Sequence, residues 1–277
     1  MIILGFGKAL RRSPRLVACL ALLQPVMALG TAVADDVRDP ATRGCEVQRE
    51  GNALRITITD DGVRDGKVEL PRFHAALRSI RWATGGGDAP SLQPEPRHWV
   101  VRWKGPPPAL EVVLEFDEPP LLDREVAPVL PATDGSFLLH ASVAADAGET
   151  LRFEPQPHKN TVGFWTIATD SASWDLDGAK AGAYSVAILQ GCGAGQGGST
   201  ATLMLGRDGE TVARVPFTIT ETGHFQNFRW FDIGTVTLSE AGRHRVTVAP
   251  ERIATAAVGD IRAISLVPLA VAPPASP

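Results

Sequence analysis

Apolar and polar residues alternate with a period of two along most of the chain. Residues 54–58 read Leu-Arg-Ile-Thr-Ile, and residues 110–116 place Leu, Val, Leu and Phe at every second position. This alternation is typical of half-buried β-strands, in which successive side chains point to opposite faces of a sheet. Residues 73–82 would also suit a short helix, and we assign them to a strand. The same alternation returns at 184–188, 201–205, 215–219 and 244–248.

Turns and prolines divide these strands into two groups. Asp-Gly pairs at 61–62, 134–135, 177–178 and 208–209 favour turns. Prolines, which cannot donate to a central ladder, crowd residues 106–131. We therefore predict an all-β protein with two antiparallel β-sandwich, jelly-roll-like domains. Their expected bounds are 35–118 and 137–268, with a Pro-rich linker at 119–136 and a tail at 269–277.

The first 34 residues have the order of a secretory signal peptide. Four basic residues precede an apolar run at 16–29, and small residues follow it up to Ala34. We expect cleavage between Ala34 and Asp35, and a secreted or periplasmic mature protein. The run is shorter than the ~20 apolar residues of a spanning helix, and no later segment qualifies, so no membrane span is expected. The export route stays open, because Arg11-Arg12 hints at a twin-arginine signal.

Net charge limits the partners expected of the mature protein, and its cysteine content limits its disulfides. The chain has 27 basic and 31 acidic residues, and removing the four basic residues of the signal peptide changes its net charge from −4 to −8. Nucleic acids and anionic membranes are therefore not expected as partners, because both need a concentrated basic patch. Cys45 and Cys192 remain in the mature chain, and the sequence allows either a disulfide or two buried thiols.

No catalytic constellation is readable. Gly193, Gly195 and Gly198 match G-x-G-x-x-G, but a strand follows them instead of a helix that could hold a phosphate. The six histidines show no metal-ligand spacing. Acidic pairs such as Asp175 and Asp177 read as solvated strand faces and turn acceptors rather than as a glycosidase dyad. We therefore expect no catalytic residues and no metal ligands, and hence no enzyme activity.

Short motifs follow the strands of residues 138–268 in a distinctive order. A Trp strand, an Ala-Gly turn and a Tyr-x-Val strand precede a Gly-rich turn, which is followed by Thr-Gly-x-Phe and by a Gly-x-His-x-Val hairpin. The motifs are His140-Ala141-Ser142, Gly163-Phe164-Trp165, Ser173-Trp174-Asp175-Leu176, Ala183-Tyr184-Ser185-Val186, Gly197-Gly198-Ser199, Thr222-Gly223-His224-Phe225, Gly242 to Val248, and Gly259 to Leu266.

In this order the motifs resemble the galactose-binding-like jelly-roll modules, that is, carbohydrate-binding modules of families 6 and 35 as appended to bacterial sulfatases and fucosidases. Residues 45–118 more weakly resemble the C-terminal β-sandwich of α-L-fucosidases, through Val68-Glu69-Leu70-Pro71 and Trp99-Val100-Val101 among others. The chain has no barrel, which needs ~250 residues of alternating strands and helices. The resemblance therefore implies glycan binding without a glycosidase body.

The resemblance also implies a structural calcium ion. His140 and Ser142 stand where that family has its early pair of acidic ligands. Asp260 is the one acid of this chain that matches the family's site. One carboxylate rarely holds Ca²⁺ alone. We therefore expect no cofactor.

Two clusters combine an aromatic side chain with amides, as sugar binding requires. Asn160 and Trp165 flank a loop beside His158, and Phe225 stands next to Gln226 and Asn227, followed by Phe228 and Trp230. We predict that Asn160, Trp165, His158, Phe225 and Asn227 bind the ligand. Trp165 could be either a stacking platform or a core residue, whereas Trp174 and Tyr184 fall on the core phase of their strands.

Three functions follow from this sequence. The favoured one is an exported, non-catalytic carbohydrate-binding protein or accessory module that recognises a polysaccharide or glycan. The first alternative is the accessory part of a fucosidase- or sulfatase-like glycan-degrading enzyme, which would then be a partner. The second alternative is a structural or protein-interaction sandwich without sugar affinity.

Overall fold

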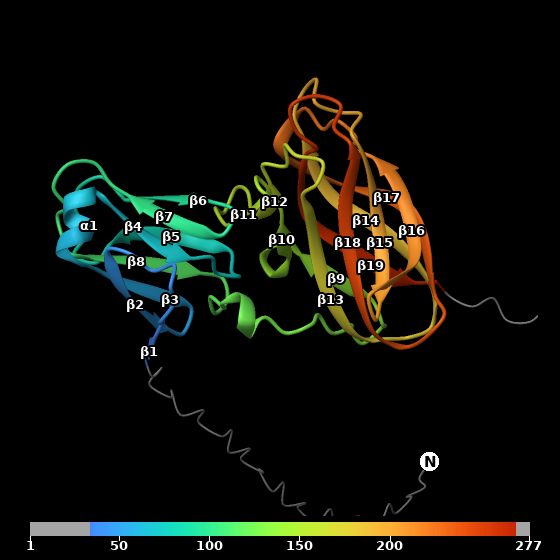
Figure 1. Cartoon of the computed structure of the whole chain (residues 1–277), viewed down its shortest axis with the longest axis horizontal. Coiled ribbons are helices and arrows are strands. Elements are labelled where there is room, and N and C mark those ends of the chain that lie inside the picture. Colours follow the sequence, from blue (N-terminus) through green and yellow to red (C-terminus); the bar gives the residue numbers. More distant parts are fainter. Residues whose placement is uncertain (1–33, 270–277) are drawn as a thin grey trace, which may run out of the picture. The chain divides into compact units, whose positions relative to one another are not determined.

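The structure is a computed structural model that describes residues 34–269. Apart from Ala34, the expected signal peptide lies outside these residues, as does most of the expected tail. The described residues belong to one compact unit, and the linker drawn at 119–136 stays a prediction. Among them, no helix is long and apolar enough to cross a bilayer. The strands pair antiparallel in four sheets (Figure 1), so the expected all-β sandwich fold is confirmed.

Two sheets build the first half of the described chain. One has the order β1–β2–β3–β8–β5 and the other the order β4–β7–β6. Trp99 packs against Phe116 across the two sheets, with ring centroids 6.1 Å apart. The strands are β1 (Asp35–Asp36), β2 (Cys45–Glu50), β3 (Ala53–Ile58), β4 (Lys67–Pro71), β5 (Leu77–Trp82), β6 (Ser91–Pro94), β7 (His98–Arg102) and β8 (Glu111–Phe116).

The first half departs from the expected strand pattern in three places. A short helix α1 (Asp60–Asp65) occupies the Asp-Gly site at 61–62. The strand expected at 73–82 begins only at Leu77. Val113 is buried although it lies on the polar phase of β8, because Arg55 and Arg81 flank it on the neighbouring strands and their aliphatic stems can cover it.

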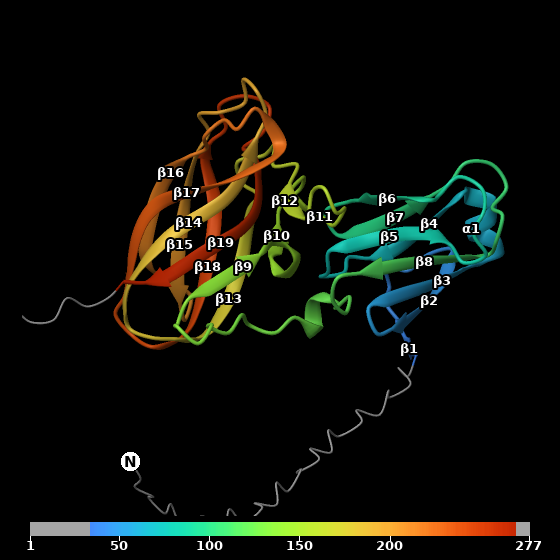
Figure 2. The same ribbon diagram turned by 180° about the vertical axis from the view of Figure 1, so that it is seen from behind.

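Two further sheets form the second half. The first has the order β10–β13–β18–β15–β16, and the second has the order β11–β12–β19–β14–β17 with β9 added beside β19. Figure 2 shows the same strands from behind. The bounds are β9 (Phe137–His140), β10 (Ala145–Ala147), β11 (Arg152–Glu154), β12 (Thr161–Gly163), β13 (Ser171–Ala179), β14 (Gly182–Cys192), β15 (Thr200–Arg207), β16 (Glu210–Thr218), β17 (His224–Leu238), β18 (Gly242–Arg252) and β19 (Asp260–Pro268); two 3₁₀ turns lie at Asp123–Glu125 and Ala141–Val143.

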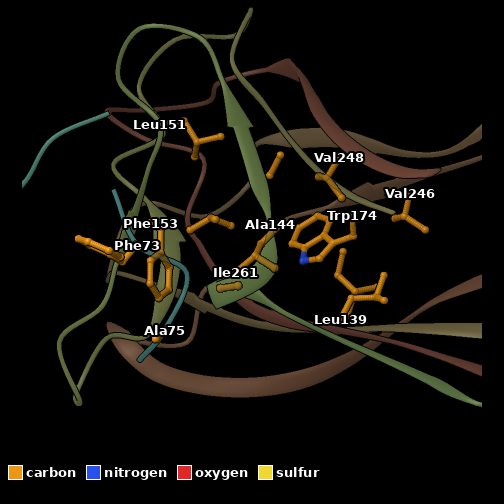
Figure 3. Close-up of a cluster of buried hydrophobic side chains, with 14 of the residues drawn as sticks. Phe73, Ala75, Leu139, Ala144, Leu151, Phe153, Trp174, Val246, Val248 and Ile261 are labelled. Carbon is orange, nitrogen blue, oxygen red and sulfur yellow. The ribbon is translucent and has the colours of Figure 1, made fainter. Parts of the chain in front are cut away.

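The core of the second half lies between these two sheets. Trp174 on β13 is buried among Val246, Val248 and Leu139 (Figure 3), and its indole nitrogen donates to the carbonyl oxygen of His140 at 2.8 Å. Tyr184 is also buried. The core positions predicted for Trp174 and Tyr184 are therefore confirmed. Because the buried residues of β14 alternate with partly exposed ones, the other face of its sheet points outward.

Candidate functional site

Trp165 lies in the core. Its side chain is fully buried, and its indole nitrogen donates to the carbonyl oxygen of Asp170 at 3.0 Å. The stacking role predicted for Trp165 is therefore wrong, since a buried ring offers no face to a sugar. The cause is local: Phe164 has a φ of +58°, and it is this neighbouring ring that is half exposed.

His158 and Asn160 lie in the turn between β11 and β12. His158 is exposed, and Asn160 has a φ of +44°, a conformation that asparagine tolerates better than most residues. The backbone N–H of Asn160 donates to the carbonyl oxygen of Gln156 at 2.9 Å. The side-chain Oδ1 of Asn160 is buried without a hydrogen-bond partner. The turn is thus ordered by its backbone and leaves one amide oxygen unused.

Arg262 on β19 joins this turn to β17. Its Nε donates to the carbonyl oxygen of Lys159 at 2.9 Å, and its Nη2 donates to that of His158 at 3.0 Å. The Cζ of Arg262 also lies 3.8 Å from the centroid of the Phe228 ring. The two clusters that the sequence indicated separately are therefore linked through a residue that we did not predict.

A β-bulge explains why Arg262 escaped the sequence pattern. Leu189 on β14 pairs with Ala263, whereas the next residue, Gln190, pairs with Ile261, so Arg262 is the extra residue. A bulge re-aims the side chain that it inserts. The one available signal was an arginine inside an apolar strand.

Phe225 and Asn227 are tied into the start of β17. The Nδ2 of Asn227 donates to the carbonyl oxygen of Thr222 at 2.6 Å. Phe225 covers Gly191 of β14 and Gly193 just after this strand: a Cβ built on Gly193 would lie 2.7 Å from its ring, and one on Gly191 would collide with its carbonyl oxygen. Both residues thus support the strand, and the contacts that they make are structural ones.

The outer face of the second sheet presents Trp230. Phe228, Trp230 and Asp232 alternate along β17 and therefore share one face. Trp230 is 49% exposed and pairs with Leu189, which pairs in turn with Ala263. We call this surface the Trp230 face; it consists of Phe228, Trp230, Asp232, Ala187, Leu189, Ala263 and Ser265.

Two carboxylates are buried beside the β11–β12 turn. Glu154 and Asp260 are each 5% exposed, and both reach Gly163 on β12. The Nζ of Lys159 lies 2.6 Å from Oε1 of Glu154. Burial, and then the neighbouring charge of Glu154, raise the pKa of Asp260 to about 8 against the opposing effect of Lys159 and Arg262.

The donors near Asp260 do not fit the calcium ion that the family resemblance implied. Ca²⁺ takes six to eight oxygen ligands, several of them carboxylates. His140 and Ser142 offer no carboxylate, and Lys159 already holds Glu154. No three His, Cys, Asp or Glu side chains in residues 34–269 are grouped closely enough to hold a metal ion.

Asp175 and Asp177, an acidic pair that we weighed as a glycosidase dyad from the sequence, take part in ion pairs. Asp175 accepts two hydrogen bonds from Arg245, at 2.6 and 2.7 Å, and Asp177 pairs with Arg243. Asp175, Arg243 and Arg245 line a groove of about 440 Å³ on the outer face of the other sheet, together with Met204. Both carboxylates are therefore held by arginines of β18.

Comparison with known proteins gives likenesses of fold only. No protein-family model matches the chain, and no curated protein matches it. Among solved structures, it is similar to a mannanase with a family 35 carbohydrate-binding module from Podospora anserina, at 20% identity and a TM-score of 0.38, over 51% of this chain and 29% of that one. It is also similar to a family 35 module from Clostridium thermocellum, at 13% identity and a TM-score of 0.37, over 47% of this chain and 96% of that one.

The fucosidase resemblance is found as well. An α-L-fucosidase from Vibrio sp. strain EJY3 matches 86% of this chain and 42% of its own length, at 12% identity and a TM-score of 0.35. The chain thus spans less than half the length of the mannanase and of the fucosidase. The similar structures include family 35 and family 6 modules, as the sequence resemblance predicted. At these identities and TM-scores they assign no ligand and no residue role to this chain.

Proposed function

We propose that the protein is an exported, non-catalytic carbohydrate-binding protein that holds a glycan on the Trp230 face. The observation that carries the proposal is the half-exposed indole of Trp230 on an outward sheet face. A sugar ring stacks its C–H side on an aromatic ring, and its hydroxyls need polar groups at the margin. Asp232 stands two residues along the same face and supplies a carboxylate.

The surroundings of Trp230 favour a flat ligand. On β19 the face presents two short side chains, Ser265 and Ala263, of which Ala263 is buried. Arg262 lies at the end of this face with its guanidinium plane fixed by two carbonyl oxygens and by the Phe228 ring. A planar, pre-ordered guanidinium loses little conformational entropy when it binds hydroxyl or carboxylate oxygens.

Export and the lack of catalysis are parts of the same proposal. Export is supported by the charged, apolar and small-residue order of residues 1–34. The non-catalytic role is supported by the ion pairs that occupy Asp175 and Asp177, and by the contact of Lys159 with Glu154. A glycan-degrading enzyme would be a natural partner for such a protein.

A protein-docking role is the second candidate. Leu138 and Val267 are 46% and 45% exposed on the same outward side of the sheet, toward its β9 edge. Exposed apolar side chains on a sheet face are common where another protein binds.

Affinity electrophoresis of the purified protein in gels with different polysaccharides, followed by a glycan array, tests the proposal. Trp230→Ala should weaken binding about 10- to 100-fold, by analogy with the 1 to 3 kcal/mol of an aromatic stacking contact. It should leave the melting temperature nearly unchanged. Phe164→Ala, which removes a half-exposed ring elsewhere, is the matched control and should bind as the wild type does. Retardation by no glycan, or equal retardation of Trp230→Ala and the wild type, would reject the Trp230 face as a glycan site.

A further inference from the structure

Two buried carboxylates converge on one glycine of β12. A Cβ built on Gly163 would lie 2.5 Å from Oδ1 of Asp260 and 3.0 Å from Oε2 of Glu154. Both oxygens therefore border a space that only the absence of a side chain at Gly163 leaves open. Burial disfavours a charge on either acid: the raised pKa of Asp260 keeps that carboxyl protonated at neutral pH, and a charged Glu154 needs a cation beside it.

The positive charge comes from the turn that connects β11 to β12. The Nζ of Lys159 lies 2.6 Å from Oε1 of Glu154, and its side chain is only 28% exposed. The backbone of Lys159 is fixed on both sides: its N–H donates to Gln156 at 2.8 Å, and its carbonyl oxygen accepts from Arg262 at 2.9 Å. The ammonium is thus positioned by the main chain.

We propose that the ammonium of Lys159 takes the place of a structural divalent cation beside Glu154, so that the protein is stable without a metal ion. A metal ion next to Glu154 would meet the ammonium at close range, and the repulsion would exclude it. Glu154, the carboxylate that a metal ion would bind, is already paired with the ammonium of Lys159, which is a cation of the chain itself. This proposal is independent of glycan binding.

Thermal unfolding with and without calcium tests it. The melting temperature of the wild-type protein should change by less than about 1 °C between excess EGTA and about 5 mM CaCl₂, because a ligand that does not bind the native state cannot stabilise it. Lys159→Met keeps the length of the side chain and removes the charge. It should melt roughly 5–10 °C lower in EGTA, because one partner of a buried ion pair is lost. Calcium at millimolar concentration should restore part of that loss, because the substitution frees Glu154, the carboxylate that Lys159 holds in the wild type, to bind it weakly beside Asp260.

Matched variants separate this role from general damage. Lys180→Met removes an exposed lysine and should change neither the melting temperature nor its response to calcium. Lys159→Arg keeps the charge and should stay indifferent to calcium. If Lys159→Met fails to fold, the double variant Glu154→Gln/Lys159→Met, which removes both charges, should fold.

Four results would overturn the proposal. The first is a wild-type protein that loses stability in EGTA. The second is a Lys159→Met variant that melts at the wild-type temperature in EGTA. The third is a Lys159→Met variant that melts lower but gains nothing from calcium. The last is a double variant that does not fold.

Discussion

The indole nitrogen of Trp165 donates to the carbonyl oxygen of Asp170, which is the residue whose carboxylate orders the loop before β11. That carboxylate accepts the backbone N–H groups of Glu149, Thr150 and Leu151 at 2.8 to 2.9 Å. Asp170 is buried, and it contacts Trp165 through its carbonyl oxygen and the loop through its carboxylate oxygens. They connect the aromatic core of the second half to a loop that has no strand partner of its own.

Trp165→Ala should therefore unfold early, as Trp174→Ala should. Both rings are buried, and deleting a buried tryptophan costs about 3 to 5 kcal/mol of unfolding free energy. Trp230→Ala should cost less than about 1 kcal/mol, because half of its ring already faces water. Urea titrations followed by far-UV circular dichroism give the three values. A Trp165→Ala protein as stable as the wild type would show that the ring is not part of the core.

Asp170→Asn should lower the unfolding free energy by about 1.5 to 3 kcal/mol at neutral pH, the range for hydrogen bonds to a charged group. Burial opposes the ionisation of Asp170, but the N–H donors of Glu149, Leu151 and Thr150 outweigh it and hold the pKa below its usual value. A carboxyl with a depressed folded-state pKa stabilises the fold above the unfolded pKa of about 3.9, and this contribution is lost as the pH falls toward the folded pKa.

The difference between Asp170→Asn and the wild type should accordingly shrink below pH ~4. Urea midpoints at several pH values measure it. Asp65→Asn, on the exposed last turn of α1, is the control and should have little effect at any pH. A difference that does not depend on pH would mean that the charge of Asp170 contributes nothing.

Arg262→Lys should loosen the turn between β11 and β12, residues 155–160. Lysine keeps the charge, but it cannot donate to the carbonyl oxygens of His158 and Lys159 while its head group stacks flat on Phe228. We expect faster amide exchange in that turn and a loss of about 1 to 2 kcal/mol in stability. Hydrogen–deuterium exchange with peptide resolution checks this, with Arg229→Lys as the exposed control. Unchanged exchange at residues 155–160 would show that Arg262 does not hold the turn.

Cys45 and Cys192 should resist alkylation in the native protein. Burial and the charge of Glu46 raise the pKa of Cys45 to about 12, and burial also raises the pKa of Cys192. The thiolate is the reactive form, so little of it is present at neutral pH. Both thiols are free, on strands of different sheets, so a reductant should not shift the melting temperature. Mass spectrometry after iodoacetamide treatment, native and in denaturing urea, gives the answer. Rapid native labelling, or a melting temperature that falls on reduction, would contradict this assignment.

The strands and much of the core could be predicted because alternation is a local property. Residues 54–58, Trp174 and Tyr184 lie on the expected face of their strands. Trp165 could not be placed in this way, because the positive φ of Phe164 changes which side chain points inward. Arg262 was hidden by a bulge, and the contact of Lys159 with Glu154 depends on how the six-residue turn at 155–160 folds back. The residues of the candidate site are therefore set by irregular backbone, namely a positive φ, a bulge and a turn, which the alternation of apolar and polar residues does not reveal.

The Trp230 face is shallow, and this affects how a ligand would be held. Leu189 lies directly beside Trp230 on β14, and the other neighbours on β14 and β19 are alanine and serine side chains, so a bound chain would be contacted from one side and its opposite side would stay in water. Such a surface does not distinguish the interior of a polymer from its end, and each contact breaks and re-forms quickly. Lasting attachment would then come from several copies on one polymer, where effective concentration multiplies weak contacts. The uncovered side of the polymer would remain accessible to other proteins.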